Sequence, residues 1–117
     1  MTNNKESTRY YSNLHEDSVC KALNGRRNAN SGAGKFTGGD VTVPSCGLLV
    51  ECKTSMSEKD SFSIKREWLE KVKQETFATR NNNSVLCFNF GPGQNNYYVI
   101  PEKLMKFLVE KLSEEEA

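Results

Sequence analysis

Apolar residues in the first quarter of the chain recur at the spacing of an amphipathic helix. They lie between Ser7, a candidate N-cap, and Gly25, a typical stop signal. The residues that share one helical face are Tyr11, Leu14, Val19, Ala22 and Leu23. We therefore expect a helix over residues 7–23, preceded by a frayed polar segment at residues 1–6.

Short β-prone runs follow in two pairs. DVTV (40–43) and LLVECK (48–53) flank the turn sequence PSCG (44–47), and this pattern predicts a β-hairpin. SVLCFNF (84–90) and YYVI (97–100) flank a second turn at residues 91–96. We expect four strands, two on each side of a long helical segment.

Two further helices are predicted beyond the first hairpin. After a polar linker at residues 54–61, residues 63–80 place Ile64, Trp68, Leu69 and Val72 on one helical face. Pro101 suits the first turn of a last helix, whose apolar residues cover more than one face. That helix either packs wholly within the domain or buries one side in the core and the other in a partner chain.

The expected order is α-β-β-α-β-β-α, or close to it, in 117 residues without internal repeats. A chain of this length forms one domain around one modest core. We therefore expect a single α/β (α+β) domain over residues 1–117, with a central mixed sheet flanked by helices and with frayed ends at 1–6 and 113–117.

Composition excludes several classes of protein. There is no apolar stretch of membrane length and no secretion-signal pattern. The four cysteines lack C-x-x-C spacing and His15 is the only histidine, so we expect no structural zinc site. The thiols are expected to be reduced in a cytoplasm, that of the host if the chain is phage-encoded, with Cys20 and Cys87 as small buried hydrophobes.

The glycine-rich segment SGAGKFTGGDV (31–41) resembles a phosphate-binding loop without matching one. A P-loop needs Ser or Thr after Gly-Lys, but Phe36 follows Gly34 and Lys35, and the first glycine of the pattern is absent. No apolar strand precedes the segment, as a dinucleotide site requires. We expect no nucleotide cofactor.

Charge is unevenly distributed although the formal net charge is only +1. The segment from Arg26 to Lys35 has three positive charges and no acid, while the acids Glu114, Glu115 and Glu116 end the chain. A basic segment can attract a polyanion locally, although an exposed basic loop is the commoner explanation of such a run.

The predicted hairpin places two acids and a lysine where they can converge. Side chains alternate along a strand, so Glu51 and Lys53 share one face while Val50 and Cys52 face the core. The hairpin can return Asp40 to the side of Glu51. Carboxylates at one spot favour a hard divalent cation such as Mg²⁺. The alternative is a surface ion pair on an exposed strand beside a turn residue.

Asp40, ten residues and then Glu51-Cys52-Lys53 resemble the D…(D/E)-x-K signature of the PD-(D/E)XK nuclease superfamily. The layout over residues 7–100 resembles the small archaeal and phage-type Holliday junction resolvases within it. The resemblance implies a restriction-endonuclease-like fold. The chain departs from the pattern with Gly39 in place of the proline of the family's name, and its last helix has no matching counterpart.

The resemblance also implies roles for individual residues. Asp40, Glu51 and the backbone carbonyl of Cys52 would hold Mg²⁺, with Mn²⁺ able to substitute, and Glu16 on the first helix would assist. We favour Glu16 over its neighbour His15, because a carboxylate suits Mg²⁺ better. Lys53 would position the attacking water, and Ser31 would be an accessory catalytic residue.

DNA contacts are expected from the basic loop and from the residues after the E-x-K strand. The expected contacts with the phosphate backbone are Arg26, Arg27, Ser31, Lys35 and Thr54, with Lys65, Arg66, Lys71 and Lys73 in second rank. The implied substrate is branched DNA, a four-way junction cut by a homodimer to 5′-phosphate and 3′-hydroxyl ends. Two alternatives stay open: a PD-(D/E)XK nuclease for another DNA structure, and a non-catalytic DNA-binding module with the same fold.

Overall fold

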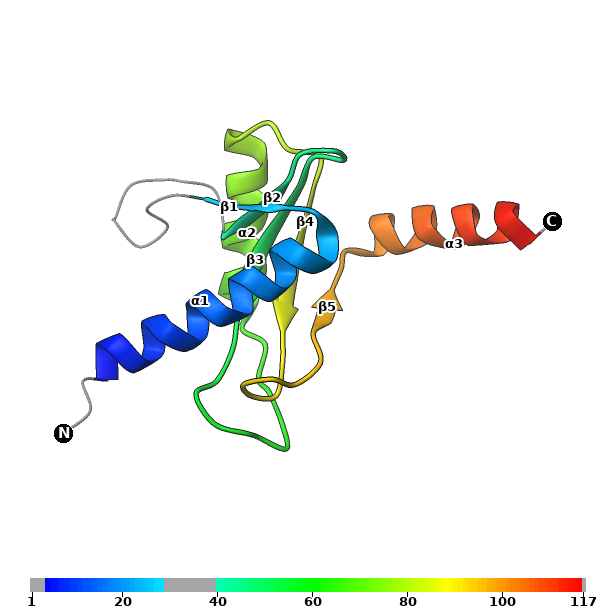
Figure 1. The fold of residues 1–117 in the computed structure, drawn as a ribbon. Coiled ribbons are helices and arrows are strands. Elements are labelled where there is room, and N and C mark those ends of the chain that lie inside the picture. The colour runs from blue at the N-terminus through cyan, green and yellow to red at the C-terminus, as the bar shows by residue number, and fades with distance from the viewer. Residues whose placement is uncertain (1–3, 29–39, 117) are drawn as a thin grey trace.

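The structure, a computed structural model, describes residues 4–28 and 40–116 of the chain. Its elements, in chain order, are α1 (Asn4–Leu23), β1 (Arg26–Arg27), β2 (Val41–Val43), β3 (Leu48–Lys53), α2 (Arg66–Ala78), β4 (Asn83–Phe88), β5 (Tyr97–Val99) and α3 (Glu102–Glu116) (Figure 1). The described residues thus form a mixed α and β fold, and all four predicted strands are present. The short strand β1 lies in a segment where the sequence predicted only loop.

The strands form one mixed sheet in the order β1-β2-β3-β4-β5. β3 pairs in parallel with β4, and every other neighbouring pair is antiparallel. Parallel neighbours need a crossover connection, and α2 supplies it between β3 and β4. β3 therefore lies in the middle of the sheet, with a hydrogen-bonded strand on each side.

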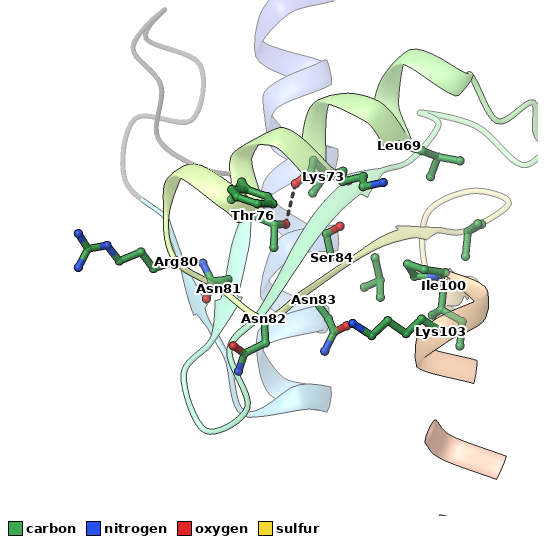
Figure 2. Close-up of a pocket in the computed structure, with 15 residues that line it drawn as sticks. Leu69, Lys73, Thr76, Arg80, Asn81, Asn82, Asn83, Ser84, Ile100 and Lys103 are labelled. Atoms are coloured by element: carbon green, nitrogen blue, oxygen red, sulfur yellow. Dashed lines mark hydrogen bonds between the residues drawn. The ribbon is translucent and has the colours of Figure 1, made fainter. Parts of the chain in front are cut away.

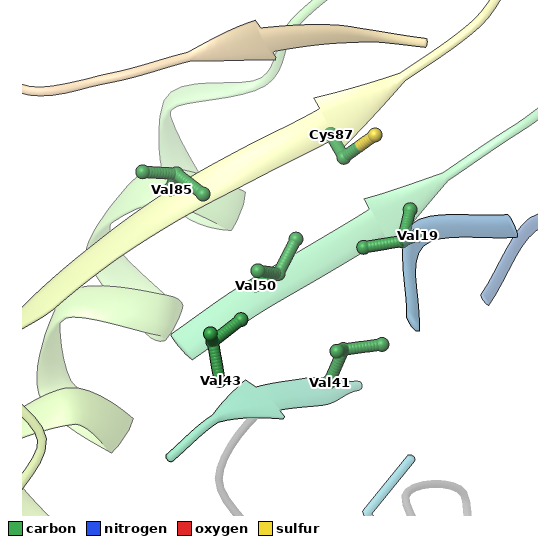
Figure 3. Close-up of a cluster of buried hydrophobic side chains, with 6 residues drawn as sticks. All are labelled: Val19, Val41, Val43, Val50, Val85 and Cys87. Carbon is green, nitrogen blue, oxygen red and sulfur yellow. The ribbon is translucent and has the colours of Figure 1, made fainter. Parts of the chain in front are cut away.

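The two faces of the sheet are covered by different helices, α1 on one and α2 on the other (Figure 1). A cluster of buried side chains packs between α1 and the sheet (Figure 3): Val19, Val41, Val43, Val50, Val85 and Cys87. Because side chains alternate along a strand, the fully buried Leu49 and Leu86 point to the opposite face, under α2. Glu51 lies on that second face as well.

Several helix ends differ from those that the sequence predicts. α1 begins at Asn4 and α3 continues to Glu116, so both helices include residues that were expected to fray. α2 begins at Arg66 rather than at residue 63, which leaves Ile64 outside the helix. Of the residues expected on the buried face of this helix, Val72 is buried, whereas Trp68 and Leu69 are half-buried. The other buried residues of α2 are Glu75 and Thr76, which were not expected.

The residue that allows α1 to end is Asn24, not Gly25. Asn24 has a φ of 56°, the left-handed conformation typical of the position after a helix. Gly25 has a different role, because a Cβ atom there would lie 2.9 Å from the carbonyl oxygen of Thr42 and 2.9 Å from Cγ1 of Val41. The chain passes so close to β2 at this point that only glycine fits without a shift.

α3 extends away from the body of the domain (Figure 1), and most of its apolar residues are exposed. Leu104 is partly buried against the core cluster. The exposed apolar residues are Met105, Phe107, Leu108, Val109 and Leu112. Core-only packing of this helix, one of the two expectations, is therefore wrong. Among the described residues, no helix combines the length and the apolar character needed to cross a membrane.

Candidate active site

Asp40, directly before β2, is held by backbone hydrogen bonds to β3 and to the residue that follows β1. Its N–H donates to the carbonyl of Val50 at 3.0 Å, and its carbonyl accepts from the N–H of Asn28 at 2.9 Å. Its carboxylate accepts a hydrogen bond from the backbone N–H of Cys52 at 2.7 Å. The hairpin thus returns Asp40 to the strand that carries Glu51, as the sequence predicted.

Glu51 and Lys53 lie on the same face of β3, toward α2. Nζ of Lys53 is 3.5 Å from Oε2 of Glu51, and the whole Glu51 residue is only 5% exposed. The same ammonium lies 4.6 Å from the ring centroid of Trp68 on α2, which is within the range of a cation–π contact. The pair is therefore enclosed by the helix, unlike a surface ion pair on an open strand.

Glu16 approaches this group from α1. It is 8% exposed, and its Oε1 accepts a hydrogen bond from Nε of Arg27 at 3.2 Å. Arg27 also donates to Oδ1 of Asn13 at 2.6 Å and lies 3.5 Å from the carboxylate of Asp17. The neighbouring His15 points elsewhere, with its Nε2 3.4 Å from the sulfur of the core residue Cys87.

Burial and mutual repulsion make these carboxyls weak acids. Burial, followed by the charge of Asp40, raises the pKa of Glu51 from 4.5 to about 7, although Lys53 and Lys71 act in the opposite direction. Burial is also the main cause of the raised pKa of Asp40. In Glu16, burial and then the charge of Asp40 raise the pKa, and Arg27 opposes them. The charge of Asp40 therefore acts on both Glu51 and Glu16.

Glu75 is a fourth acid that the sequence analysis did not single out. It is 4% exposed on α2, and its Oε1 has no hydrogen-bond partner in the structure. Its charge adds to the raised pKa values of both Asp40 and Glu51. The helical spacing from Trp68 and Val72 to residue 75 could have placed it on the face that packs against the sheet.

The expected DNA-binding residues have different environments. The hydroxyl of Thr54 donates to Oδ1 of Asn89 at 2.6 Å, so it is engaged within the fold. Arg26 is exposed on β1, and Lys65 and Arg66 are exposed at the start of α2, where Nζ of Lys65 lies 5.7 Å from the Trp68 ring. Ser31 and Lys35 lie outside the residues that the structure describes.

The donor set suits Mg²⁺ better than a metal that needs a closed cage. In the described part of the chain, no group of three or more His, Cys, Asp or Glu side chains is arranged to hold a metal ion. Mg²⁺ commonly binds through one or two carboxylates and completes its shell with water and substrate phosphate. Asp40 and Glu51 could supply such a pair, and a divalent cation between them would relieve the repulsion that contributes to the raised pKa of Glu51.

Comparisons of the chain with protein-family models, with curated proteins and with solved structures found no match.

Proposed function

We propose that this chain is a Mg²⁺-dependent, structure-selective DNA endonuclease that cuts four-way junctions by phosphodiester hydrolysis. The observation that carries the proposal is the convergence of Asp40, Glu51 and Lys53 at the end of β3. A buried carboxyl (Glu51), a partly buried one (Asp40) and an ammonium 3.5 Å from Glu51 form a set suited to metal-assisted attack of water on a phosphate.

The arrangement of elements supports a restriction-endonuclease-like fold as the finer assignment. A mixed sheet lies between two helices, and its central strand carries the E-x-K residues. The acid that completes the signature directly precedes the first strand of the same hairpin, and the following helix crosses over to a parallel strand. The residues that match the D…(D/E)-x-K pattern thus come together on one hairpin.

Asp40 and Glu51 would hold the cation, together with the backbone carbonyl of Cys52, and Glu16 would assist. When bound, Mg²⁺ would neutralise the carboxylates and stabilise the charge that develops on the scissile phosphate. Arg27 keeps Glu16 in place through the 3.2 Å contact with its carboxylate. Mn²⁺ should support the same reaction, since it accepts oxygen ligands as well.

Lys53 would supply a positive charge fixed in position. Its contacts with Glu51 and Trp68 hold the ammonium beside the Glu51 carboxylate. From there it can orient the attacking water and stabilise the phosphoryl oxygen as negative charge builds up. The in-line attack would leave a 5′-phosphate and a 3′-hydroxyl.

The exposed cations near this end of the sheet would position the DNA. Arg26, Lys65 and Arg66 are exposed and can contact phosphates without reading bases. Such contacts suit an enzyme that selects the shape of a junction rather than a sequence. A four-way junction also has two equivalent strands to cut, so a two-fold dimer would match its symmetry.

The test is cleavage of four-way junctions, nicked duplex and linear duplex, each with Mg²⁺, Mn²⁺ or EDTA. We expect paired symmetric nicks in the junction, dependent on the metal, and at least about tenfold slower cutting of linear duplex. Equal cutting of all three substrates would contradict junction selectivity and indicate a nuclease of broader or different selectivity. Binding without cleavage, with or without metal, would indicate that the chain is a non-catalytic DNA-binding module.

A further inference from the structure

α3 carries an apolar stripe that no described residue of its own domain covers. Met105, Leu108, Val109 and Leu112 are spaced i, i+3, i+4 and i+7, so they lie on one face of the helix. They are between 40% and 60% exposed. Leu104, the partly buried residue, lies before the stripe and packs against the core. A stripe of this kind on a projecting helix is a docking surface rather than part of a domain core.

The domain also has a groove of matching character. It lies between the second half of α2, the start of β4 and the end of β5, and its volume is about 720 Å³ (Figure 2). Its apolar lining includes Leu69, Val72, Phe77, Val99, Ile100 and Pro101. Phe77 is 87% exposed, the largest exposed fraction among the large hydrophobic residues of the described chain. We call this surface the α2–β5 groove.

The α3 helix of the same chain cannot fill the α2–β5 groove while it remains one straight helix. Pro101 and Lys103 both line the groove, so α3 begins at its wall and leads away from it (Figures 1 and 2). Only Ile100 and Pro101 separate β5 from α3, too few residues for the helix to turn back. At 1.5 Å per residue, its 15 residues extend about 22 Å from the domain. The helix is therefore placed to reach another molecule.

Charge is complementary between the two surfaces. Lys73 and Lys103 line the α2–β5 groove, and Figure 2 shows the Lys103 side chain extending across it toward Asn83. The outer half of α3 carries Glu110, Glu114 and Glu115, and its one lysine in that half, Lys111, lies 3.4 Å from Glu114. With about 3.6 residues per turn, Glu110 and Glu114 lie on the face of α3 opposite the stripe, whereas Glu115 lies beside it. Glu115 is therefore the acid placed to meet the lysines of the groove.

From these surfaces we infer that two copies of this chain form a dimer by exchanging α3. The stripe of each α3 packs in the α2–β5 groove of the other copy, and the acidic end of the helix lies beside its lysines. The two contacts are equivalent, as two-fold symmetry requires, so each copy gives a helix and receives one. The inference goes beyond the proposed nuclease activity and does not depend on it.

The first test is sedimentation equilibrium of the full chain without DNA. We expect a dimer that Leu112→Glu weakens at least about tenfold, because the change puts a charge into an apolar contact. Phe107→Glu is the matched control, since Phe107 is 52% exposed on the same helix but lies off the stripe. Phe77→Glu in the groove should weaken the dimer as Leu112→Glu does. Circular dichroism checks that each variant is folded.

A second test separates exchange from folding back. Two differently tagged chains, one with Phe77→Cys and one with Leu112→Cys, both in a Cys46→Ser background, are mixed and oxidised. A disulfide between the two chains is expected. A monomeric wild type at about 100 µM would overturn the inference. So would equal dimerisation of all the variants, or a Phe77→Cys/Leu112→Cys double variant that links only within one chain. Because no test measures cleavage, failure of the nuclease proposal would leave these results unaffected.

Discussion

The carboxylate of Asp40 accepts a hydrogen bond from the backbone N–H of Cys52 at 2.7 Å. This contact joins the residue before β2 to the strand that carries Glu51 and Lys53. The position of the acid is therefore set by the backbone of the hairpin, and a side chain of the same shape can occupy it. Charge and position at residue 40 can be separated by substitution.

Asp40→Asn should abolish cleavage and preserve the fold. Asparagine keeps an oxygen that can accept the Cys52 hydrogen bond but loses the charge that would hold the cation. We expect the single-turnover rate on a junction to fall at least about 100-fold, with junction affinity unchanged within about threefold. Asp60→Asn is the control, because Asp60 is an exposed acid outside the site. Full activity of Asp40→Asn would remove this residue from the site.

Lys53→Ala should separate cutting from binding. Loss of the ammonium removes charge stabilisation at the phosphate, and we expect cleavage to fall about 100-fold. Junction binding in Ca²⁺ or EDTA should hardly change, as measured by fluorescence anisotropy. Lys59→Ala, an exposed lysine outside the site, should leave both unchanged. A parallel loss of binding would mean that Lys53 is a DNA contact instead.

Glu51→Gln should stabilise the metal-free protein at alkaline pH. The pKa of Glu51 is about 7 in the folded state and 4.5 ordinarily, so the folded state holds this proton more tightly. The free energy of unfolding of the wild type therefore falls as pH rises from 4.5 to 7. Glutamine cannot ionise, and the variant should be more stable by about 1–3 kcal/mol at pH 8.

The difference in free energy of unfolding between Glu51→Gln and the wild type should nearly vanish at pH 4, where Glu51 is largely protonated. Urea unfolding in EDTA at pH 4 and pH 8 measures this difference. Mg²⁺ at pH 8 should raise the stability of the wild type more than that of the variant. His15, whose burial lowers its pKa, is common to both proteins, so its contribution cancels in the difference. Equal stability of the wild type and Glu51→Gln at pH 8 would contradict a Glu51 pKa raised by burial and by the charge of Asp40.

Substitutions of the adjacent residues Arg26 and Arg27 should have different effects on stability and on DNA binding. Arg27 forms an ion pair with the buried Glu16, so Arg27→Gln should cost about 1–2 kcal/mol in the free energy of unfolding. Arg26 is exposed on β1, and Arg26→Gln should weaken junction binding and lower its salt dependence without loss of stability. Thermal unfolding and salt-dependent anisotropy measure the two effects, and identical behaviour would contradict the assignment.

Gly25→Ala should destabilise the fold, whereas Asn24→Gly should not. A Cβ at residue 25 would lie 2.9 Å from a backbone oxygen of β2, so the chain must shift, at a cost of about 1–3 kcal/mol. Glycine accepts the φ of 56° at residue 24, and stability should change by less than about 0.5 kcal/mol. Denaturant unfolding of both variants tests the distinction between a close approach and a left-handed turn.

Local patterns were sufficient for the elements with strong apolar periodicity. The strand residues 48–53 match β3, and alternation placed Glu51 and Lys53 on the face opposite Val50. By contrast, β1 consists of two arginines, and it is a strand only because β2 provides partners for it. A pairing across fourteen residues or more leaves no trace in local hydrophobic pattern, so β1 could not be predicted.

The site was only partly predictable for a similar reason. Glu16, Asp40, Glu51 and Lys53 follow from spacing and resemblance, but Glu75 does so only once α2 is known to cover that face of the sheet. The direction of α3 also could not be predicted from the sequence. An apolar stripe has the same spacing whether its own domain or another molecule covers it.

The position of β3 in the middle of the sheet affects the order in which the site can be assembled. The four candidate site residues Glu16, Asp40, Glu51 and Lys53 all precede residue 54. β3, however, receives its second neighbour only from β4, at residues 83–88. A growing chain that stops before β4 contains all four of these side chains but has an unpaired strand edge beside them. For the proposed nuclease, hydrolytic activity should therefore arise late in synthesis, when the crossover helix docks, and truncated chains should not cut DNA.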